Sequence, residues 1–217
     1  MHCQVNSLQA GLCNGRLFSC AGHGVSPDLP QHVLGLDSTY MFTMVRHPWD
    51  RLLSTFHYLK ANPHSAMLAP DINTSVLLSL APTIQAFVAY PGINNCMTKM
   101  LNGLRCGESI EINEQHLDVA KRVLTALQGF GITGYFKTSI CLFYWMYGGD
   151  VNSQFFQKWR QGHYDKGSAM DILGQETYNV FLHREKFDLE LYSYAHSLFL
   201  SRLSTTGCPI IDHIEVI

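Results

Sequence analysis

The chain has 217 residues, and 47% of them are hydrophobic, which is enough for the core of one domain. A formal net charge of −2 and a pI near 6.6 argue against a broad nucleic-acid-binding surface. No linker, repeat or low-complexity run divides the chain, so we expect a single domain over residues 1–217. No stretch reaches the roughly 18 to 20 apolar residues that cross a bilayer, and no signal peptide is visible at Met1.

The first clear element is a strand followed by a helix. The uncharged segment Tyr40–Val45 predicts a strand buried on both faces. Pro48 suits the first position of a helix, and Asp50 in the first turn complements the helix dipole. Helical spacing predicts a buried face made of Trp49, Leu52, Leu53, Phe56 and Leu59.

The strand ends on Arg46, at a junction where an anion can be held. Its planar guanidinium can bind a phosphate through two hydrogen bonds, and Ser54 on the following helix adds a neutral donor. Ser54 falls on the side of the helix opposite the buried face, together with His47, Arg51 and Tyr58. The alternative is an ordinary strand and helix with a solvated arginine and a packing serine.

The rest of the chain alternates loops, helices and one further strand. We expect a Pro-, Ala- and Ser-rich loop over Asn62–Thr83, which contains the glycosylation sequon Asn73-Thr-Ser75, and a polar and aromatic loop over Asn152–Gly174. The predicted strand is Phe130–Thr133, directly after Gly129, which should end the preceding helix. The predicted helices are Ile84–Ala89, Glu114–Gln128, Thr138–Tyr147, Glu176–His183 and Asp188–Leu203.

Strands that alternate with helices predict a parallel α/β sheet with a ligand at the carboxyl ends of its strands. Arg46 lies at such an end, and the apolar helix Thr138–Tyr147 should be buried. The seven cysteines show no CxxC pair and no zinc-like spacing, so we expect no metal. Cys96 and Cys106 could close a disulfide in an oxidising lumen.

The junction also resembles a known family. Val45-Arg-His-Pro48-Trp-Asp-Arg51-Leu-Leu-Ser54, followed by an aromatic residue, is similar to the 3′-phosphate-binding motif of the Golgi-type carbohydrate sulfotransferases. These enzymes use 3′-phosphoadenosine-5′-phosphosulfate (PAPS) as donor. The resemblance implies that Arg46 and Ser54 hold the 3′-phosphate of the nucleotide. Arg51 matches the motif in type, and we expect it to support the loop rather than to bind the ligand.

Three later segments extend the resemblance, which runs from about His23 to about Leu203. Pro91–Gly103 is similar to an Asn-x-Met-Thr-x-Met-Leu-x-Gly helix of the family. Phe130–Phe136 resembles a Val-Gly-Leu-Thr-Glu-x-Phe strand, which implies that Thr133 lies at the nucleotide site. Lys186–Phe199 resembles the closing Asp-x-Glu-Leu-Tyr-x-x-Ala helix.

The resemblance implies a P-loop-NTPase-like parallel sheet flanked by helices, and sulfuryl transfer from PAPS to a glycan hydroxyl. Phe18–Gly24 resembles the Gly-His segment of the uronyl 2-O-sulfotransferase branch, which makes His23 the candidate general base. His32 and His47 are weaker candidates, and His47 could instead touch the phosphate. A surface-loop histidine is the alternative for His23. The partner implied is a carbohydrate acceptor, which we expect the loop Asn152–Gly174 to face, and the location implied is the Golgi lumen or membrane.

One part of the family pattern is missing. Complete members have a loop with Pro-Lys-x-Gly/Ala-x-Thr-Ser that cradles the 5′-phosphosulfate, whereas Gly11–Arg16 has no preceding apolar strand and no following Thr or Ser. We therefore expect an N-terminally truncated form that has also lost its membrane anchor. The alternative is a non-catalytic relative that binds adenosine 3′,5′-bisphosphate or acts as an interaction domain. A P-loop kinase is disfavoured because Gly-x-x-x-x-Gly-Lys-Ser/Thr is absent.

Overall fold

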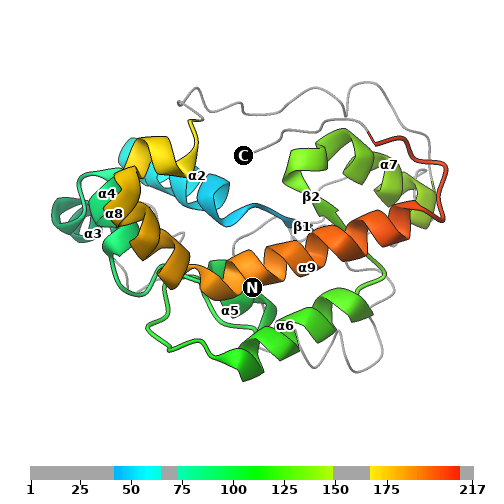
Figure 1. Cartoon of the computed structure of the whole chain (residues 1–217), viewed down its shortest axis with the longest axis horizontal. Coiled ribbons are helices and arrows are strands. Elements are labelled where there is room, and N and C mark those ends of the chain that lie inside the picture. Colours follow the sequence, from blue (N-terminus) through cyan, green and yellow to red (C-terminus); the bar gives the residue numbers. More distant parts are fainter. Residues whose placement is uncertain (1–41, 65–72, 149–166, 211–217) are drawn as a thin grey trace.

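A computed structural model describes residues 42–64, 73–148 and 167–210 of the chain (Figure 1). The described part is mixed α/β and mostly helical, with a small parallel sheet formed by β1 (Phe42–Val45) and β2 (Gly129–Ile132). The helices are α2 (Pro48–Ala61), α3 (Thr74–Leu80), α4 (Ile84–Ala89), α5 (Cys96–Leu101), α6 (Glu114–Ala126), the 3₁₀ turn η2 (Thr133–Tyr135), α7 (Phe136–Tyr147), α8 (Ala169–Arg184) and α9 (Lys186–Leu203).

The predicted parallel pairing of the two strands is confirmed. Phe42 pairs with Gly129 and Val45 with Ile132, so the register runs without interruption. All of β2 is buried, but Phe42–Met44 of β1 are only half-buried, which corrects the expectation of a strand buried on both faces. The difference arises because α7 and α9 both pack against β2, whereas β1 makes its main contacts in the described residues with β2.

Glycine in β2 allows α7 to pack closely against the sheet. A Cβ on Gly131 would lie 2.5 Å from both Met44 Sδ and Ser139 Cβ. Ser139, on the first turns of α7, donates its hydroxyl proton to Ile132 O (3.1 Å) and accepts from Ile132 N (2.9 Å). The close approach and the paired hydrogen bonds fix α7 at the carboxyl end of β2.

Two hydrophobic clusters form the interior. One lies between β2, α6, α7 and α9, and α9 runs across the molecule between α6 and α7 (Figure 1). The other joins α2, α3, α4 and α8. The predicted buried face of α2 is confirmed in full: all five predicted residues are buried, namely Trp49, Leu52, Leu53, Phe56 and Leu59.

Several element boundaries differ from the sequence prediction. The helix α4 forms as predicted, but α6 ends at Ala126, so Gly129 begins β2 rather than ending the helix. The expected loop over 62–83 contains α3, which begins where Asn73 Oδ1 accepts from the backbone N–H groups of Ser75 and Val76. An asparagine at this position satisfies helix donors that would otherwise have no partner.

Two further predictions need correction. The helix α7 is not uniformly buried, since Trp145 is 57% exposed, because only one side of the helix meets the sheet. The expected acceptor-facing loop over 152–174 lies outside the described residues as far as 166, and Ala169–Gly174 already belong to α8. Gly174, with φ 72° and ψ 163°, interrupts that helix before the predicted segment Glu176–His183.

Two disulfides are present in the described residues. Cys96 pairs with Cys106, as the sequence suggested, and closes the segment around α5. Cys141 on α7 pairs with Cys208, which follows α9. Over the described ranges, the helices are all too short or too polar to traverse a lipid bilayer.

Candidate functional site

Arg46 and Thr133 lie at the same end of the sheet. Each directly follows a strand, and the last residues of the two strands, Val45 and Ile132, are paired. Arg46 and Thr133 are both half-buried. The carboxyl ends of parallel strands meet at one edge of a sheet, so the fold brings a guanidinium residue and a hydroxyl residue to neighbouring positions there.

Ser54 lies two turns into α2 and is also half-buried. At 1.5 Å per residue, it is about 9 Å along the helix axis from Pro48. Two helical turns separate it from His47, so both residues are on one side of α2. A ligand shared by Arg46 and Ser54 would therefore lie along the first two turns of this helix.

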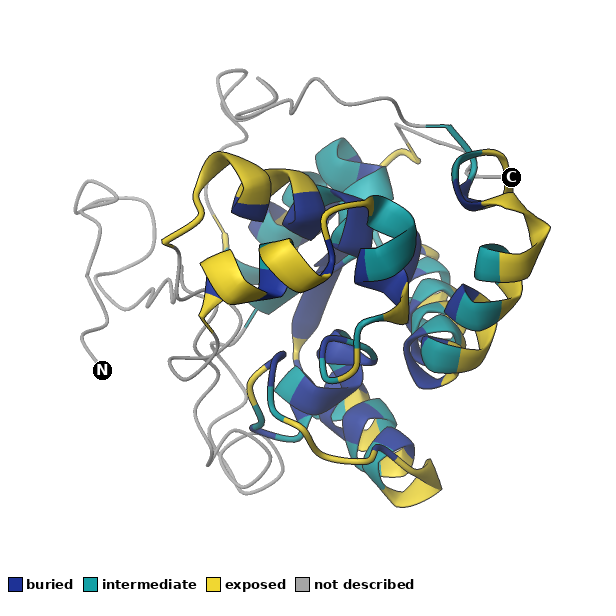
Figure 2. Ribbon diagram, turned by 90° about the vertical axis from the view of Figure 1, so that its left-hand side faces the viewer, coloured by how far each residue is buried: buried dark blue, intermediate teal, exposed yellow. Residues whose placement is uncertain are grey.

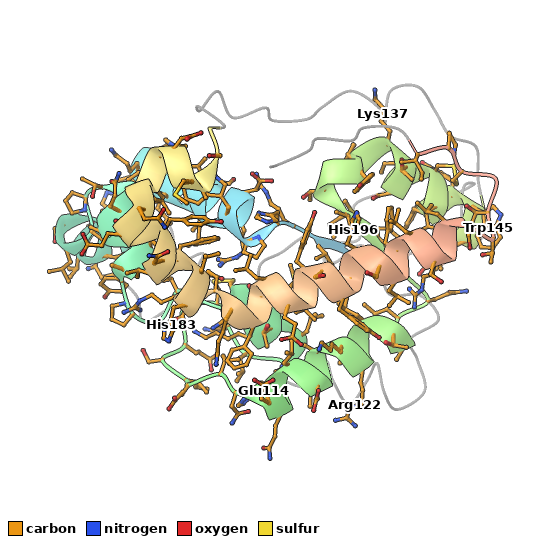
Figure 3. All side chains as sticks on the ribbon, viewed as in Figure 1. Glu114, Arg122, Lys137, Trp145, His183 and His196 are labelled. Atoms are coloured by element: carbon orange, nitrogen blue, oxygen red, sulfur yellow. A yellow bond between two sulfur atoms is a disulfide. The ribbon has the colours of Figure 1, made fainter. Side chains whose placement is uncertain are left out.

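Four ring side chains, here called the ring row, connect the two strand ends. His47 contacts Tyr192 of α9 edge to face, with ring centroids 5.0 Å apart. Tyr192 stacks on His196, one turn further along α9, at 6.4 Å. His196 in turn contacts Tyr135 after β2, and its Nε2 is 3.0 Å from the Tyr135 hydroxyl. Figure 3 labels His196 on α9, on the side turned towards α7.

Burial changes the acid–base properties of the ring row. Desolvation lowers the pKa of His47, although Asp50 partly opposes the effect, and His47 Nδ1 has no hydrogen-bond partner in the described residues. For Tyr192, desolvation, followed by the nearby Tyr135 and Asp50, raises the pKa to about 12. Both side chains are therefore neutral near pH 7 and contribute ring surface and hydrogen-bonding atoms rather than charge.

Most of the ring row could not be predicted from the sequence, which indicates His47 as a possible phosphate contact but not Tyr135, Tyr192 or His196. The available signals were the i, i+4 spacing of Tyr192 and His196 on a helix and the position of Tyr135 just after a strand. These two signals indicate a contact only once it is known that α9 crosses the end of the sheet.

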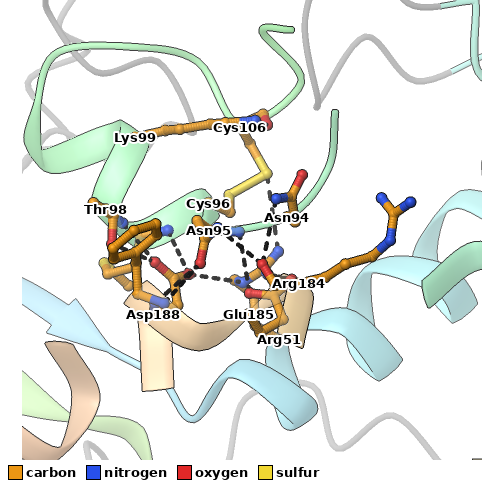
Figure 4. Close-up of polar contacts among 12 residues, drawn as sticks. Arg51, Asn94, Asn95, Cys96, Thr98, Lys99, Cys106, Arg184, Glu185 and Asp188 are labelled. Carbon is orange, nitrogen blue, oxygen red and sulfur yellow. Dashed lines mark hydrogen bonds and ion pairs between the residues drawn. A yellow bond between two sulfur atoms is a disulfide. The ribbon is translucent and has the colours of Figure 1, made fainter. Parts of the chain in front are cut away.

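A second polar cluster, here called the buried ion cluster, consists of Arg51, Lys99, Glu185 and Asp188 (Figure 4). The Arg51 side chain is 11% exposed; its Nη2 is 2.9 Å from Glu185 Oε1 and its Nε is 3.8 Å from Asp188 Oδ2. Arg51 thus joins α2 to the start of α9. We predicted a supporting role for Arg51, and these contacts show one, although its partners are carboxylates of α9 and the residue before it.

Hydrogen bonds made by the side chains of Asp188 and Asn95 hold α5 against α9 (Figure 4). Asp188 accepts from Met97 N (2.8 Å), from Thr98 N (2.7 Å) and from the Thr98 hydroxyl (2.7 Å). Asn95 has a left-handed backbone (φ 49°, ψ 42°), which asparagine tolerates better than most residues, and its Oδ1 accepts from the backbone N–H groups of Phe187 and Asp188. The segments Pro91–Gly103 and Lys186–Phe199, which the sequence resemblance identified separately, therefore bind each other through side-chain-to-backbone hydrogen bonds.

Lys99 and Glu185 are ionisable side chains that are buried near the contact between α5 and the start of α9. Lys99 donates to the carbonyl oxygens of Gly92 (2.7 Å), Glu108 (2.8 Å) and Cys106 (3.3 Å). Desolvation lowers its pKa to about 8, even though Glu185 and Asp188 favour the charged form. Desolvation raises the pKa of Glu185 to about 7, and Arg51 opposes this shift. The cluster is structural, since its charged groups pair with one another and with backbone groups; Arg51 Nε is buried without a hydrogen bond and has only the ion-pair contact with Asp188.

The remaining predicted residues lie outside the described part of the chain. These are His23, the candidate general base, its weaker alternative His32, and the loop candidate Gly11–Arg16. Among residues 42–64, 73–148 and 167–210, no three His, Cys, Asp or Glu side chains are grouped so that they could hold a metal ion.

Comparisons with known proteins give no assignment: no protein-family model, no curated protein and no solved structure matches this chain.

Proposed function

We propose that this protein is a sulfotransferase domain of the Golgi carbohydrate type, with a P-loop-NTPase-like core, that moves a sulfuryl group from PAPS to a glycan hydroxyl. The observation that carries the proposal is the parallel register of β1 and β2, which puts Arg46 and Thr133 side by side at the carboxyl edge. The helix bearing Ser54 begins at the same edge. This edge is where open α/β sheets bind nucleotides.

The chemistry of these residues fits the 3′-phosphate of the donor. Arg46 supplies a permanently charged planar donor, which binds phosphate oxygens more strongly than a neutral donor does. Ser54 supplies a hydroxyl from the adjoining helix, and Thr133 supplies one from the neighbouring strand end. The docking of α5 on α9 supports the same proposal, because it joins two of the segments on which the family resemblance rests.

In the proposed transfer, a glycan hydroxyl oxygen attacks the sulfur atom, and the bond between sulfur and the departing nucleotide oxygen breaks. His23 takes the hydroxyl proton as general base, and adenosine 3′,5′-bisphosphate leaves with the electron pair of the broken bond. A second candidate function is nucleotide binding without transfer. It is favoured by the absence of a Pro-Lys-x-Gly/Ala-x-Thr-Ser segment, whose lysine and backbone N–H groups would stabilise the leaving charge.

Calorimetry with adenosine 3′,5′-bisphosphate tests the site. We expect Arg46→Ala to weaken binding at least about tenfold, or about 1.4 kcal/mol, because a charge-assisted phosphate contact is lost. Arg122→Ala is the matched control: Arg122 is an exposed arginine on α6, away from the sheet edge, and its loss should leave the affinity unchanged (Figure 3). Equal affinities of wild type and Arg46→Ala for the nucleotide would show that Arg46 does not bind it and would contradict the proposed site.

The two candidate functions differ in one measurement. Incubation with PAPS that carries a labelled sulfuryl group, together with a set of glycosaminoglycan acceptors, should yield labelled glycan if the protein is a transferase. Binding of the bisphosphate in calorimetry with no labelled glycan would support the non-catalytic candidate instead.

A further inference from the structure

Asn73 begins the sequon Asn73-Thr74-Ser75, the single Asn-x-Ser/Thr sequence with x other than proline in the whole chain. Asn73 and Ser75 are exposed, whereas Thr74 between them is buried and anchors the segment. The end of the molecule that carries α3 faces the viewer in Figure 2, where exposed residues line the surface. The sequon is therefore presented on the outside of the fold.

The orientation of the Asn73 amide leaves its nitrogen available. Its Oδ1 accepts from Ser75 N (3.0 Å) and from Val76 N (3.2 Å), and two N–H donors require the oxygen in that place. Asn73 Nδ2 makes no hydrogen bond to the described residues. A substituent on Nδ2 would therefore leave the hydrogen bonds that start α3 intact.

A second, weaker sequon in the chain provides a comparison with Asn73. Asn94-Asn95-Cys96 has the weaker Asn-x-Cys form, but Asn94 is half-buried and its Nδ2 donates to Arg184 O (3.3 Å). Cys96, the residue at the hydroxyl-equivalent position, is paired with Cys106. A sugar on Asn94 would displace a contact between α5 and the end of α8, whereas one on Asn73 would displace nothing described.

The disulfides indicate the compartment in which such a modification occurs. Cys96–Cys106 and Cys141–Cys208 are both formed, and disulfides form and persist in oxidising compartments such as the secretory lumen. This is the compartment in which asparagine sequons of secreted proteins receive glycans. The compartment and the exposed amide are independent observations that point to the same modification.

We propose that Asn73 carries an N-linked glycan. In the reaction, Asn73 Nδ2 forms a bond to the anomeric carbon of an oligosaccharide, and the bond from that carbon to a lipid pyrophosphate carrier breaks. The pyrophosphate leaves with the electron pair, and one Nδ2 proton is released to a base of the transferring enzyme. The proposal does not depend on nucleotide binding, because α3 lies at the opposite end of α2 from the sheet (Figure 1).

The test is translation of the full chain, with an added signal peptide, in the presence of mammalian microsomes. We expect the protease-protected product to migrate more slowly by one glycan and to return to the unmodified position after treatment with an endoglycosidase. Peptide mass spectrometry should find the sugar on Asn73 and not on Asn94. A protease-protected chain without the shift would overturn the proposal, because translocation would then have occurred without modification.

Three variants separate loss of the sequon from loss of structure. Asn73→Asp keeps a side-chain oxygen for the helix start and should abolish the shift. Ser75→Ala keeps the asparagine and should also abolish the shift, whereas Ser75→Thr restores a hydroxyl and should retain it. A shift that persists in Asn73→Asp would place the glycan elsewhere and contradict the proposal.

Discussion

Asp188 shows how one buried side chain can determine the position of a helix. Its carboxylate is 1% exposed and accepts three hydrogen bonds from α5, and it also lies near the Arg51 guanidinium. A carboxylate buried in this way is stable only while its donors are present, and the donors are satisfied only while the carboxylate is present. The interaction therefore couples the positions of α5 and α9.

We expect Asp188→Ala to lower the free energy of unfolding by about 3–5 kcal/mol, because it leaves buried donors and part of the Arg51 charge without a partner. Urea unfolding followed by circular dichroism measures the change. Glu190→Ala is the matched control on the same helix: its pair with Lys121 is exposed, with Glu190 56% exposed, and should contribute at most about 1 kcal/mol. Similar losses in the two variants would contradict the role assigned to Asp188.

At the scale of single elements, the packing of β2 against α7 depends on the absence of a side chain. The Cβ of an alanine at Gly131 would overlap Met44 Sδ and Ser139 Cβ, and Ser139 lies on a helix that cannot move without breaking its bonds to Ile132. The strand and helix would have to separate. The neighbouring Gly134 has nothing within 4 Å of its Cβ position.

We therefore expect Gly131→Ala to destabilise the protein by about 1–3 kcal/mol, the usual cost of overpacking a well-filled core. Gly134→Ala, three residues away, should change stability by less than about 0.5 kcal/mol, as expected of a substitution that meets no neighbour. Thermal unfolding of the two variants beside wild type checks the difference. If both alanines were tolerated equally, the close contact between β2 and α7 would be refuted.

Sequence periodicity predicted elements well where one face of a helix is apolar. Five helices appear within two residues of their predicted bounds at one or both ends, namely α2, α4, α6, α7 and α9. Periodicity missed α3, where the signal is the side chain of Asn73 rather than an apolar stripe. It predicted α7 to within two residues (Thr138–Tyr147 against Phe136–Tyr147), but not that part of the apolar surface of this helix is exposed. Capping chemistry and tertiary burial decide these cases, and neither is contained in hydrophobic spacing.

The candidate site was likewise predicted from the sequence only in part. The strand-to-helix junction predicted that Arg46 and Ser54 would be near a sheet edge, and the resemblance of Phe130–Phe136 implied Thr133 at the same site. The parallel pairing puts Arg46 and Thr133 at one edge of the sheet. The ring row could not be predicted, because it requires knowing that α9 passes the ends of both strands. Contacts between residues more than a hundred positions apart depend on topology, which local sequence does not specify.

At the scale of the whole molecule, the buried ion cluster makes stability depend on pH. Desolvation raises the pKa of Glu185 from its usual 4.5 to about 7, so the folded state holds this proton more tightly than the unfolded chain does. The contribution of Glu185 to stability is fully present below about pH 4.5 and is lost as the pH rises through about 7. His47, whose pKa is lowered, acts in the opposite direction, so the two effects must be separated by mutation.

We expect the stability difference between wild type and Glu185→Gln to shift against wild type, by up to about 3 kcal/mol, as the pH rises from 4.5 to about 7. The variant cannot ionise at this position, while His47 and all other groups titrate in both proteins. Urea unfolding at a series of pH values gives the difference directly. A difference that is constant over this range would show that Glu185 titrates normally.

The pairing of β1 with β2 has a consequence for the order in which the chain acquires its structure. Residues 46–128 separate the two strands, so their ladder can form only after a long intervening segment has been brought to closure. Local helices such as α2 and α6 need no such closure, and high contact order slows the folding of small domains. We therefore expect the sheet to form late in folding, after the local helices, so that the apolar faces that pack against it stay exposed to solvent until then.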